Sequence, residues 1–258
     1  MIEFDAEIQL PAVLSKAEGQ GYARRDQPWS IVIRWDGADG VGTIGSDVLP
    51  LPDRSSFSVD ATLLRSNGFG PVNELALASW GLRRATASSP HRVLFSVSTS
   101  FLLETAKLRA FRVLQSDAEL WAIGDVKDLS VEDVASNGIR TTLQTVAAVW
   151  GTADHVCILP NNAPLNGFSD PESARLAANI GRMLREESYA NQIPDPTAGS
   201  LLLDTAVGRL VDAVEKRVQD FDATGASSLQ ALLILPSVER LRARDQAWWA
   251  SRTNRPQS

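Results

Sequence analysis

Short apolar runs alternate with longer amphipathic stretches from Phe57 onward. The apolar runs have the length of buried strands, and the expected strands are residues 57–60, 92–97, 119–123 and 155–159. The stretches between them are expected to be helices at about 71–84, 101–114 and 133–150. Strands that alternate with helices are typical of βα units, so the pattern predicts an α/β fold with a parallel sheet.

Two later helices carry clearer signals. Residues 169–172 read Ser-Asp-Pro-Glu, which combines an N-cap, a first-turn proline and a capping-box glutamate. Apolar residues on one face then extend this helix to about residue 187. In the next helix, apolar side chains recur at helical spacing from Val207 to Phe221, and Gly225 is a natural stop. We interpret each apolar face as core packing rather than as a cofactor site.

The two ends of the chain differ from this middle region, and we divide the chain into 1–56, 57–225 and 226–258. The first region has an apolar run at 30–35 and then many glycines and prolines, so we expect an N-terminal arm or cap. The last region contains spaced arginines and the adjacent Trp248 and Trp249, which need a surface to cover them. We expect it to be a docking tail or subunit contact, with a frayed terminus as the alternative.

Composition narrows the class of protein. The chain has 258 residues, of which 44% are hydrophobic, so it can bury a substantial core. Its formal charge of −6 argues against a nucleic-acid surface, which needs clustered Lys and Arg. No apolar run reaches the ~20 residues that span a membrane, and the N-terminus is acidic, so we expect a cytoplasmic protein. The one cysteine, Cys157, lies in an apolar run and is expected to be a buried, inert thiol.

Four short motifs follow one another along the chain. The first is V-D-A-T-L-L-R-S-N-G at 59–68, with V-N-E-L-A at 72–76, and the second is F-L-L-E-T-A-K-L-R-A at 101–110. The third is N-G-I-R-T-T at 137–142, with A-D at 153–154 and I-L-P at 158–160. The fourth is L-R-E-E-S at 184–188, with D-P-T-A-G-S at 195–200. In this order and spacing the motifs resemble the barrel domain of B12-dependent methylmalonyl-CoA mutases, most of all that of the small, non-catalytic subunit.

The resemblance implies a (β/α)8 barrel whose open interior is lined by small polar side chains, so that the pantetheine arm of an acyl-CoA can pass along its axis. Such a barrel takes about 250 residues. The matched region resembles only the later units, so we expect a partial or shortened TIM-type (β/α) barrel with parallel strands and an N-terminal arm. The arm or another chain would have to cover the remaining strand edges, because unpaired edges invite aggregation.

The resemblance also implies a cofactor, but this chain lacks the sequence motif that binds it. The mutases bind adenosylcobalamin through a separate domain, in which a D-x-H-x-x-G motif supplies the lower axial histidine. The two histidines here do not match, because Ser89 stands two residues before His91 and Ala153 two before His155. We therefore expect no cofactor and no metal on this chain alone, and adenosylcobalamin on a partner subunit.

The family's catalytic positions are also replaced. The catalytic chains carry a Tyr-His pair in G-Y-H-x-x-E-A-G, where the imidazole can hydrogen-bond the migrating thioester carbonyl. The equivalent positions here are Thr62 and Leu63, and a leucine cannot donate a hydrogen bond. In the small-subunit pattern a histidine comes slightly later, where this chain has Arg65. Thr62, Arg65 and Asn67 are therefore catalytic candidates by their place in the motif, without the family's Tyr-His pair.

A glycine-rich stretch before the first motif suggests a nucleotide site. Residues 40–45 spell G-x-G-x-x-G, which in dinucleotide-binding proteins must open a helix facing the pyrophosphate. Pro50 and Pro52 follow too soon for such a helix. We therefore expect a flexible turn.

The loop at 195–200 suggests a second anion site. Its backbone N–H groups near Thr197, Gly199 and Ser200 could face a CoA phosphate, so these residues are CoA-binding candidates. Capping of the next helix by Ser200 is the simpler interpretation.

Three functional hypotheses remain open. The first is a mutase small-subunit-like protein, a non-catalytic partner of a cobalamin-binding large subunit in an acyl-CoA carbon-skeleton rearrangement. The second is a free-standing acyl-CoA or pantetheine-binding module, alone or as a homo-oligomer. The third is an active isomerase that uses cobalamin bound by another protein, with Thr62, Arg65 and Asn67 near the substrate. A stable complex with a large subunit would support the first hypothesis. Tight binding of a CoA ester by the isolated chain would support the second, and loss of turnover on replacing Arg65 would support the third.

Overall fold

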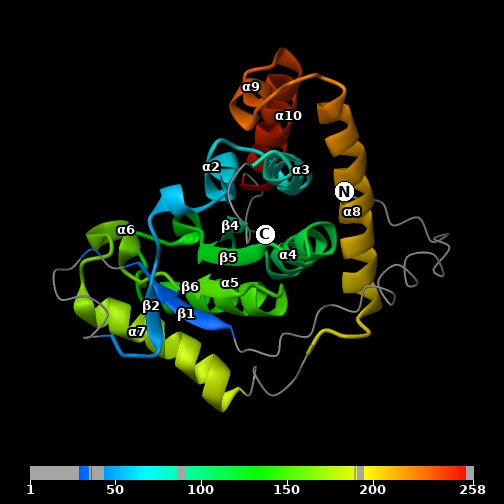
Figure 1. Cartoon of the computed structure of the whole chain (residues 1–258). Coiled ribbons are helices and arrows are strands. Elements are labelled where there is room, and N and C mark those ends of the chain that lie inside the picture. The colour runs from blue at the N-terminus through cyan, green and yellow to red at the C-terminus, as the bar shows by residue number, and fades with distance from the viewer. Residues whose placement is uncertain are drawn as a thin grey trace.

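Six parallel strands form one sheet with helices packed around it in the computed structural model (Figure 1). The structure describes residues 29–34, 36, 44–85, 91–188, 190 and 195–253, with the backbone alone at Arg252 and Thr253. The strands are β1 (Ser30–Ile33), β2 (Val48–Pro50), β3 (Val59–Asp60), β4 (Arg92–Val97), β5 (Glu119–Gly124) and β6 (His155–Cys157). The α-helices are α2 (Ala61–Ser66), α3 (Pro71–Leu82), α4 (Phe101–Leu114), α5 (Asn137–Trp150), α6 (Ala163–Asn166), α7 (Pro171–Arg182), α8 (Leu201–Asp222), α9 (Leu229–Leu233) and α10 (Pro236–Thr253).

The strand order is the one that a (β/α) barrel would show if it were opened at one seam. It runs β2-β1-β6-β5-β4-β3, so strands adjacent in sequence are adjacent in the sheet except for β2 and β3, which form its two edges, and β1 returns to pair with β6. Ser30 lies opposite His155 in that ladder. Within 44–85, which is described throughout, no ladder joins β2 to β3. The fold is therefore an open α/β sheet of the partial TIM-barrel type, as predicted, and the N-terminal region supplies two of its strands.

Several element ends differ from the sequence prediction because local capping decides them. The helix expected from 133 begins at Asn137, since Asp133 and Ser136 form a hydrogen-bonded turn before it. The helix expected from 207 begins at Leu201, because Ser200 caps its first turn. The α-helix expected to reach 187 ends at Arg182 and continues as a π-helical turn.

The predicted glycine-rich turn lies partly outside the described residues, which exclude 40–43. In the described part, Gly45 has a φ of +125°, a conformation that glycine adopts readily, and strand β2 follows at Val48. No helix begins between Ile44 and Pro50 in this described stretch. A dinucleotide-binding turn is therefore not formed there.

The two faces of the sheet bury different sets of side chains. One face joins α3, α4, α5, α7 and α8 in the main apolar core. Helix α8 lies outside α3 and α4 as a further layer (Figure 1), with Val207, Val211, Val214, Val218 and Phe221 buried. The opposite face carries a second apolar cluster, Val32, Phe57, Leu94, Trp121, Ile123, Leu129, Cys157, Leu159 and Ala163. Among the described residues, no helix is long and apolar enough to cross a membrane.

Helix α7 approaches the sheet closely at a glycine. A Cβ at Gly181 would lie 2.9 Å from side-chain atoms of both Ile31 and Ile158. We expect Gly181→Ala to lower the free energy of unfolding by about 1–3 kcal/mol, because the overpacking outweighs the better helix propensity of alanine. Urea unfolding followed by circular dichroism measures this.

The matched control is Gly138→Ala in α5, where a Cβ would meet no atom of the described residues within 4 Å. This variant should be neutral or up to about 1 kcal/mol more stable. Equal effects of the two substitutions would show that packing at α7 does not decide the result.

Candidate functional site

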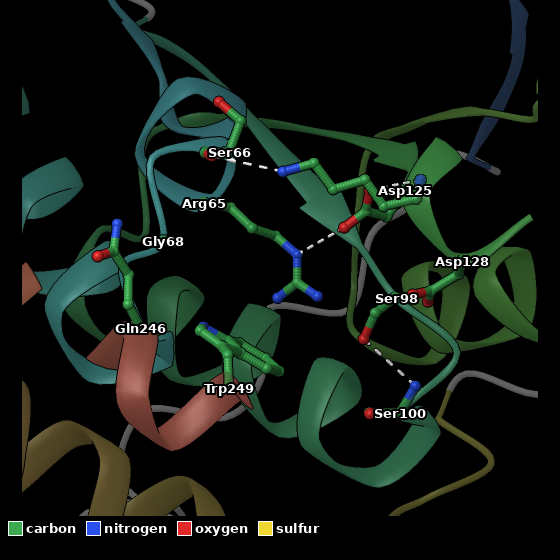
Figure 2. A pocket seen from close by; sticks show the side chains of 10 residues that line it. Arg65, Ser66, Gly68, Ser98, Ser100, Asp125, Asp128, Gln246 and Trp249 are labelled. Atoms are coloured by element: carbon green, nitrogen blue, oxygen red, sulfur yellow. Dashed lines mark hydrogen bonds and ion pairs between the residues drawn. The ribbon is translucent and has the colours of Figure 1, made fainter. Parts of the chain in front are cut away.

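A cavity of about 620 Å³ opens at the carboxyl edge of the parallel sheet. Its wall comes from α2, from the segments that follow β4 and β5, and from α10 (Figure 2). Ligand sites of parallel α/β folds form at this edge, because the loops that follow the strands converge there. The lining residues are Arg65, Ser66, Gly68, Ser98, Ser100, Asp125, Lys127, Asp128, Gln246 and Trp249.

Arg65 lies in the wall of this cavity, and its side chain is only 10% exposed. Its Nε atom donates to Asp125 Oδ2 at 2.8 Å, and Nη1 lies 3.4 Å from Glu104 Oε1. The guanidinium carbon lies 4.7 Å from the centre of the Trp249 ring, a cation–π contact visible in Figure 2. Burial alone would lower the pKa of Arg65, but the carboxylates of Glu104, Glu74 and Asp125 outweigh it and raise the pKa. Arg65 is therefore a permanent cation.

Next to Arg65, a cluster of three fully buried charged side chains lies between α3 and α4, formed by Glu74, Glu104 and Lys107. Lys107 Nζ lies 2.7 Å from Glu104 Oε2 and 3.2 Å from Glu74 Oε2, and it donates to the Ser96 carbonyl at 2.8 Å. All three side chains are 0% exposed. Such a cluster is stable only if each charge keeps its partner, because a lone buried charge is very costly.

The two carboxyls of this cluster differ in pKa. Burial raises the pKa of Glu74 to about 7, although Lys107 and Arg65 oppose the shift. Burial acts on Glu104 in the same direction, but the charges of Lys107 and Arg65 and the hydrogen bonds from Lys107 and Ser98 outweigh it and lower its pKa. Glu74 is therefore the member of the cluster that takes up a proton near neutral pH.

Hydroxyl and carboxyl groups complete the cavity wall. Ser98 Oγ donates to Glu104 Oε1 at 2.6 Å and accepts from the Ser100 backbone N–H at 3.3 Å. Asp128 accepts from the Thr99 backbone N–H, and burial raises its pKa. The cavity therefore offers a cation and short polar groups beside carboxylates.

Of the three catalytic candidates, the structure brings only Arg65 into the cavity wall. Thr62 donates its hydroxyl to Asp60 and accepts from Arg54 at 2.7 Å, outside the cavity. Asn67 donates through its side chain to the Leu63 carbonyl at 2.6 Å. Both side chains have local structural partners.

The three CoA candidates, Thr197, Gly199 and Ser200, lie away from this cavity. The Thr197 backbone N–H donates to Asp195 at 2.9 Å, and Asp195 also forms an ion pair with Arg109. Arg109 in turn donates to the Trp150 carbonyl at the end of α5, and β6 begins shortly after that point. The loop therefore lies toward the amino edge of the sheet. Ser200 accepts from the Leu203 backbone N–H and caps α8, which agrees with the simpler interpretation.

Both histidines also lie at the amino edge. His91 directly precedes β4, and its Nδ1 is 3.3 Å from Ser58 Oγ. His155 begins β6, stacks on Trp121 at 3.9 Å, and its Nε2 lies 2.8 Å from Glu119. An axial ligand of cobalamin needs an imidazole nitrogen that faces the cobalt, and neither position presents one to the cavity, so the residues do not fit this cofactor. Within the described residues, no group of three or more His, Cys, Asp or Glu could hold a metal ion.

The second face of the sheet differs from the open, polar barrel interior that the resemblance implies. Its strand residues include Leu94, Trp121 and Ile123, and Trp121 packs edge-on against Phe57 at 5.5 Å. Cys157 lies in the same cluster, and burial raises the pKa of its thiol to about 12, in line with the expected buried, inert cysteine. Large apolar side chains therefore fill this face in the described strands.

Sequence reasoning missed most of the cavity wall and the buried cluster. Glu74, Glu104 and Lys107 stand inside the motifs at 72–76 and 101–110, on helices whose neighbouring residues are apolar. A charged residue on an apolar helix face is the signal that could have found them. Trp249 lies too far along the chain for any local pattern to join it to Arg65.

Comparison with known proteins agrees with the motif pattern. A family model described as methylmalonyl-CoA mutase matches residues 77–253. The chain is 29% identical over 213 residues to the methylmalonyl-CoA mutase small subunit of Propionibacterium freudenreichii subsp. shermanii, covering 69% of this chain and 32% of that subunit. It is 28% identical over 173 residues to the methylmalonyl-CoA mutase large subunit of Streptomyces virginiae, covering 59% and 23%. To the human mitochondrial methylmalonyl-CoA mutase it is 25% identical over 170 residues, covering 59% and 22%.

These matches span about a third or less of each relative's own length. The family model nevertheless covers well over half of this chain, and it includes α4, α5, α8 and the second half of α3. The chain therefore belongs to the methylmalonyl-CoA mutase family.

Proposed function

We propose that this chain is a small-subunit-like, non-catalytic component of a cytoplasmic mutase that rearranges the carbon skeleton of an acyl-CoA, with adenosylcobalamin on a larger partner subunit. The observation that carries the proposal is the position of the two histidines. His91 and His155 lie at the amino edge of the sheet, and the cavity lies at the carboxyl edge.

The family's catalytic positions also supply no free donor for a migrating thioester carbonyl in this chain. Leu63 cannot donate a hydrogen bond, and its side chain is 54% exposed. The neighbouring Thr62 hydroxyl donates to Asp60. Adenosylcobalamin would supply the radical chemistry when it is bound to the partner.

An apolar hollow on the outside of the molecule supports a protein partner. It has a volume of about 530 Å³ and is lined by Phe101, Gly138, Ile139, Thr142, Leu143, Val146 and Trp150. Ile139 is 74% exposed, and exposed apolar patches of this kind mark protein contacts. The relatives named as small and large subunits support a mutase chain as the partner.

Native mass spectrometry of the protein purified under mild conditions from its own cell tests the proposal. We expect a complex in fixed ratio with a larger, cobalamin-carrying mutase chain. The isolated chain, supplied with adenosylcobalamin and methylmalonyl-CoA, should show no turnover. Monomers or homo-oligomers alone would contradict the partner role.

A matched pair of variants locates the contact. Ile139→Glu should weaken the complex by at least about tenfold, because it buries a charge in the apolar hollow. Ile234→Glu replaces an isoleucine that is even more exposed, at 81%, and lies outside the hollow, so it should leave the complex intact. Equal effects of the two substitutions on the complex would show that the interface does not lie at the apolar hollow.

The cavity itself favours a second candidate function, binding of an acyl-CoA or its pantetheine arm by this chain alone. Arg65 and the hydroxyls of Ser98 and Ser100 could contact oxygen atoms of such a ligand. Titration calorimetry with methylmalonyl-CoA tests this, with Arg65→Met expected to abolish the heat signal and Ser200→Ala expected to keep it. An undiminished signal for Arg65→Met would place the ligand outside the cavity.

A further inference from the structure

Helix α10 forms one wall of the carboxyl-edge cavity through Gln246 and Trp249. Both side chains bind the connection between α2 and α3. Gln246 Nε2 donates to the Asn67 carbonyl at 3.0 Å, and Trp249 Nε1 donates to the Phe69 carbonyl at 3.4 Å. The segment near the end of the chain therefore closes over residues that follow β3.

Asp245 anchors this half of α10. Its side chain accepts from the Gly70 backbone N–H at 2.8 Å and from Asn73 Nδ2 at 2.6 Å, and the residue is 9% exposed. Gly70 is the N-cap of α3 and has no side chain that could cap the helix. Asp245 therefore places a carboxylate at the positive end of α3, in the role that an N-cap side chain usually fills.

The first half of α10 is the part that packs on the main core. Val238 is 1% exposed, and the partly buried Leu241 packs on the main core. The helix begins at Pro236, directly after a short connection in which Ile234 is 81% exposed. Apart from the half-buried Trp248 and Trp249, the second half of α10 carries no large apolar side chain. Its separation from α3 would therefore expose mainly these two rings and leave the main core covered, which is the condition for local opening.

Trp249 shields the arginine of the cavity. Its ring lies over Arg65, whose Nη1 is buried and, among the described residues, has no partner besides the 3.4 Å ion pair with Glu104. Figure 2 shows the guanidinium of Arg65 directed toward the Trp249 ring. Removing the ring would expose a donor that can bind an oxygen acceptor.

We propose that the second half of α10 is a lid over the carboxyl-edge cavity, that Asp245 latches it to the start of α3, and that opening uncovers Arg65. This goes beyond the partner role and does not rest on it. The lid would control which molecules reach the cavity, and it would couple ligand entry to release of the Asp245 contacts.

Hydrogen–deuterium exchange of the full chain tests the latch. In Asp245→Asn, amide exchange in peptides covering 67–73 and 240–250 should rise on the order of ten- to a hundredfold, because charge-assisted hydrogen bonds are lost. Peptides from β4 and β5 should exchange as in the wild type. The control, Glu239→Gln, changes an exposed acid on the same helix that pairs with Arg242, and it should leave exchange unchanged. Unchanged exchange in α10, or an equal rise throughout the protein, would overturn the proposal.

A second variant tests the lid without touching the cap of α3. Trp249→Ala should increase labelling of Arg65 by the arginine reagent phenylglyoxal several-fold, while Trp248→Ala should change it little. Peptide mass spectrometry measures the labelled fraction. Equal labelling of Arg65 in the wild type and in Trp249→Ala would show that the tryptophan does not shield it, and would contradict the lid.

Discussion

Replacing Lys107 with methionine should lower the free energy of unfolding by about 3–5 kcal/mol, because it leaves buried carboxylates without their cation. Lys107 is completely buried, and its Nζ contacts both Glu74 and Glu104 and donates to the Ser96 carbonyl. Methionine keeps much of the side-chain volume, so the decrease in the free energy of unfolding results from the missing charge rather than from a cavity. Urea unfolding at pH 8, followed by circular dichroism, measures it.

Two further variants separate this effect from a general intolerance of substitution. Lys216→Met replaces an exposed lysine on α8 and should change stability by less than about 0.5 kcal/mol. Combining Glu74→Gln with Lys107→Met should recover part of the loss, because one of the two stranded carboxylates is then neutral. A double variant as unstable as the single one would show that the charge on Glu74 is not the cause.

Wild-type protein should lose about 3 kcal/mol of stability relative to Glu74→Gln as the pH rises from about 4.5 to 8. The pKa of Glu74 is raised in the folded protein from 4.5 to about 7, mainly by burial. The folded state therefore holds this proton more tightly than the unfolded state does. The resulting stabilisation is complete below the unfolded pKa and is lost as the pH rises through about 7.

Paired unfolding curves of the two proteins across this range provide the measurement. Glutamine is neutral at every pH, so subtracting the variant removes the contributions of other groups. The lowered pKa of Glu104 has the opposite effect on stability. Its stabilising contribution is present above its unfolded pKa and is lost as the pH falls below about 4.5, outside the range of this experiment. A constant difference between the two proteins would mean that the pKa of Glu74 is not raised in the folded state.

Local signals were sufficient for several elements of the fold. The run at Arg92–Val97 and the helix at Phe101–Leu114 have the predicted ends, because both are fixed by short-range apolar patterns. The insertion of β1 between β2 and β6 was not predicted. That pairing joins segments far apart in the chain, and the periodicity of the run at 30–35 does not identify its neighbours.

The candidate site was predictable only in part, for the same physical reason. Arg65 was found because it stands inside a motif, but its surroundings come from three other segments that include Asp125, Glu104 and Trp249. Thr62 and Asn67 share the motif and yet have local structural partners. Neighbours in sequence need not share a site, since a helix directs successive side chains to different faces.

The position of β1 has a consequence for biosynthesis. Ile31 and Ile33 are almost completely buried in the folded chain, and β1 pairs with β6, which leaves the ribosome roughly 125 residues later. At ~5–20 residues per second, this apolar strand waits on the order of ten seconds for its partner. We expect β3 to β6 to assemble first and the N-terminal strands to join last, so that the nascent chain depends on chaperones during that interval.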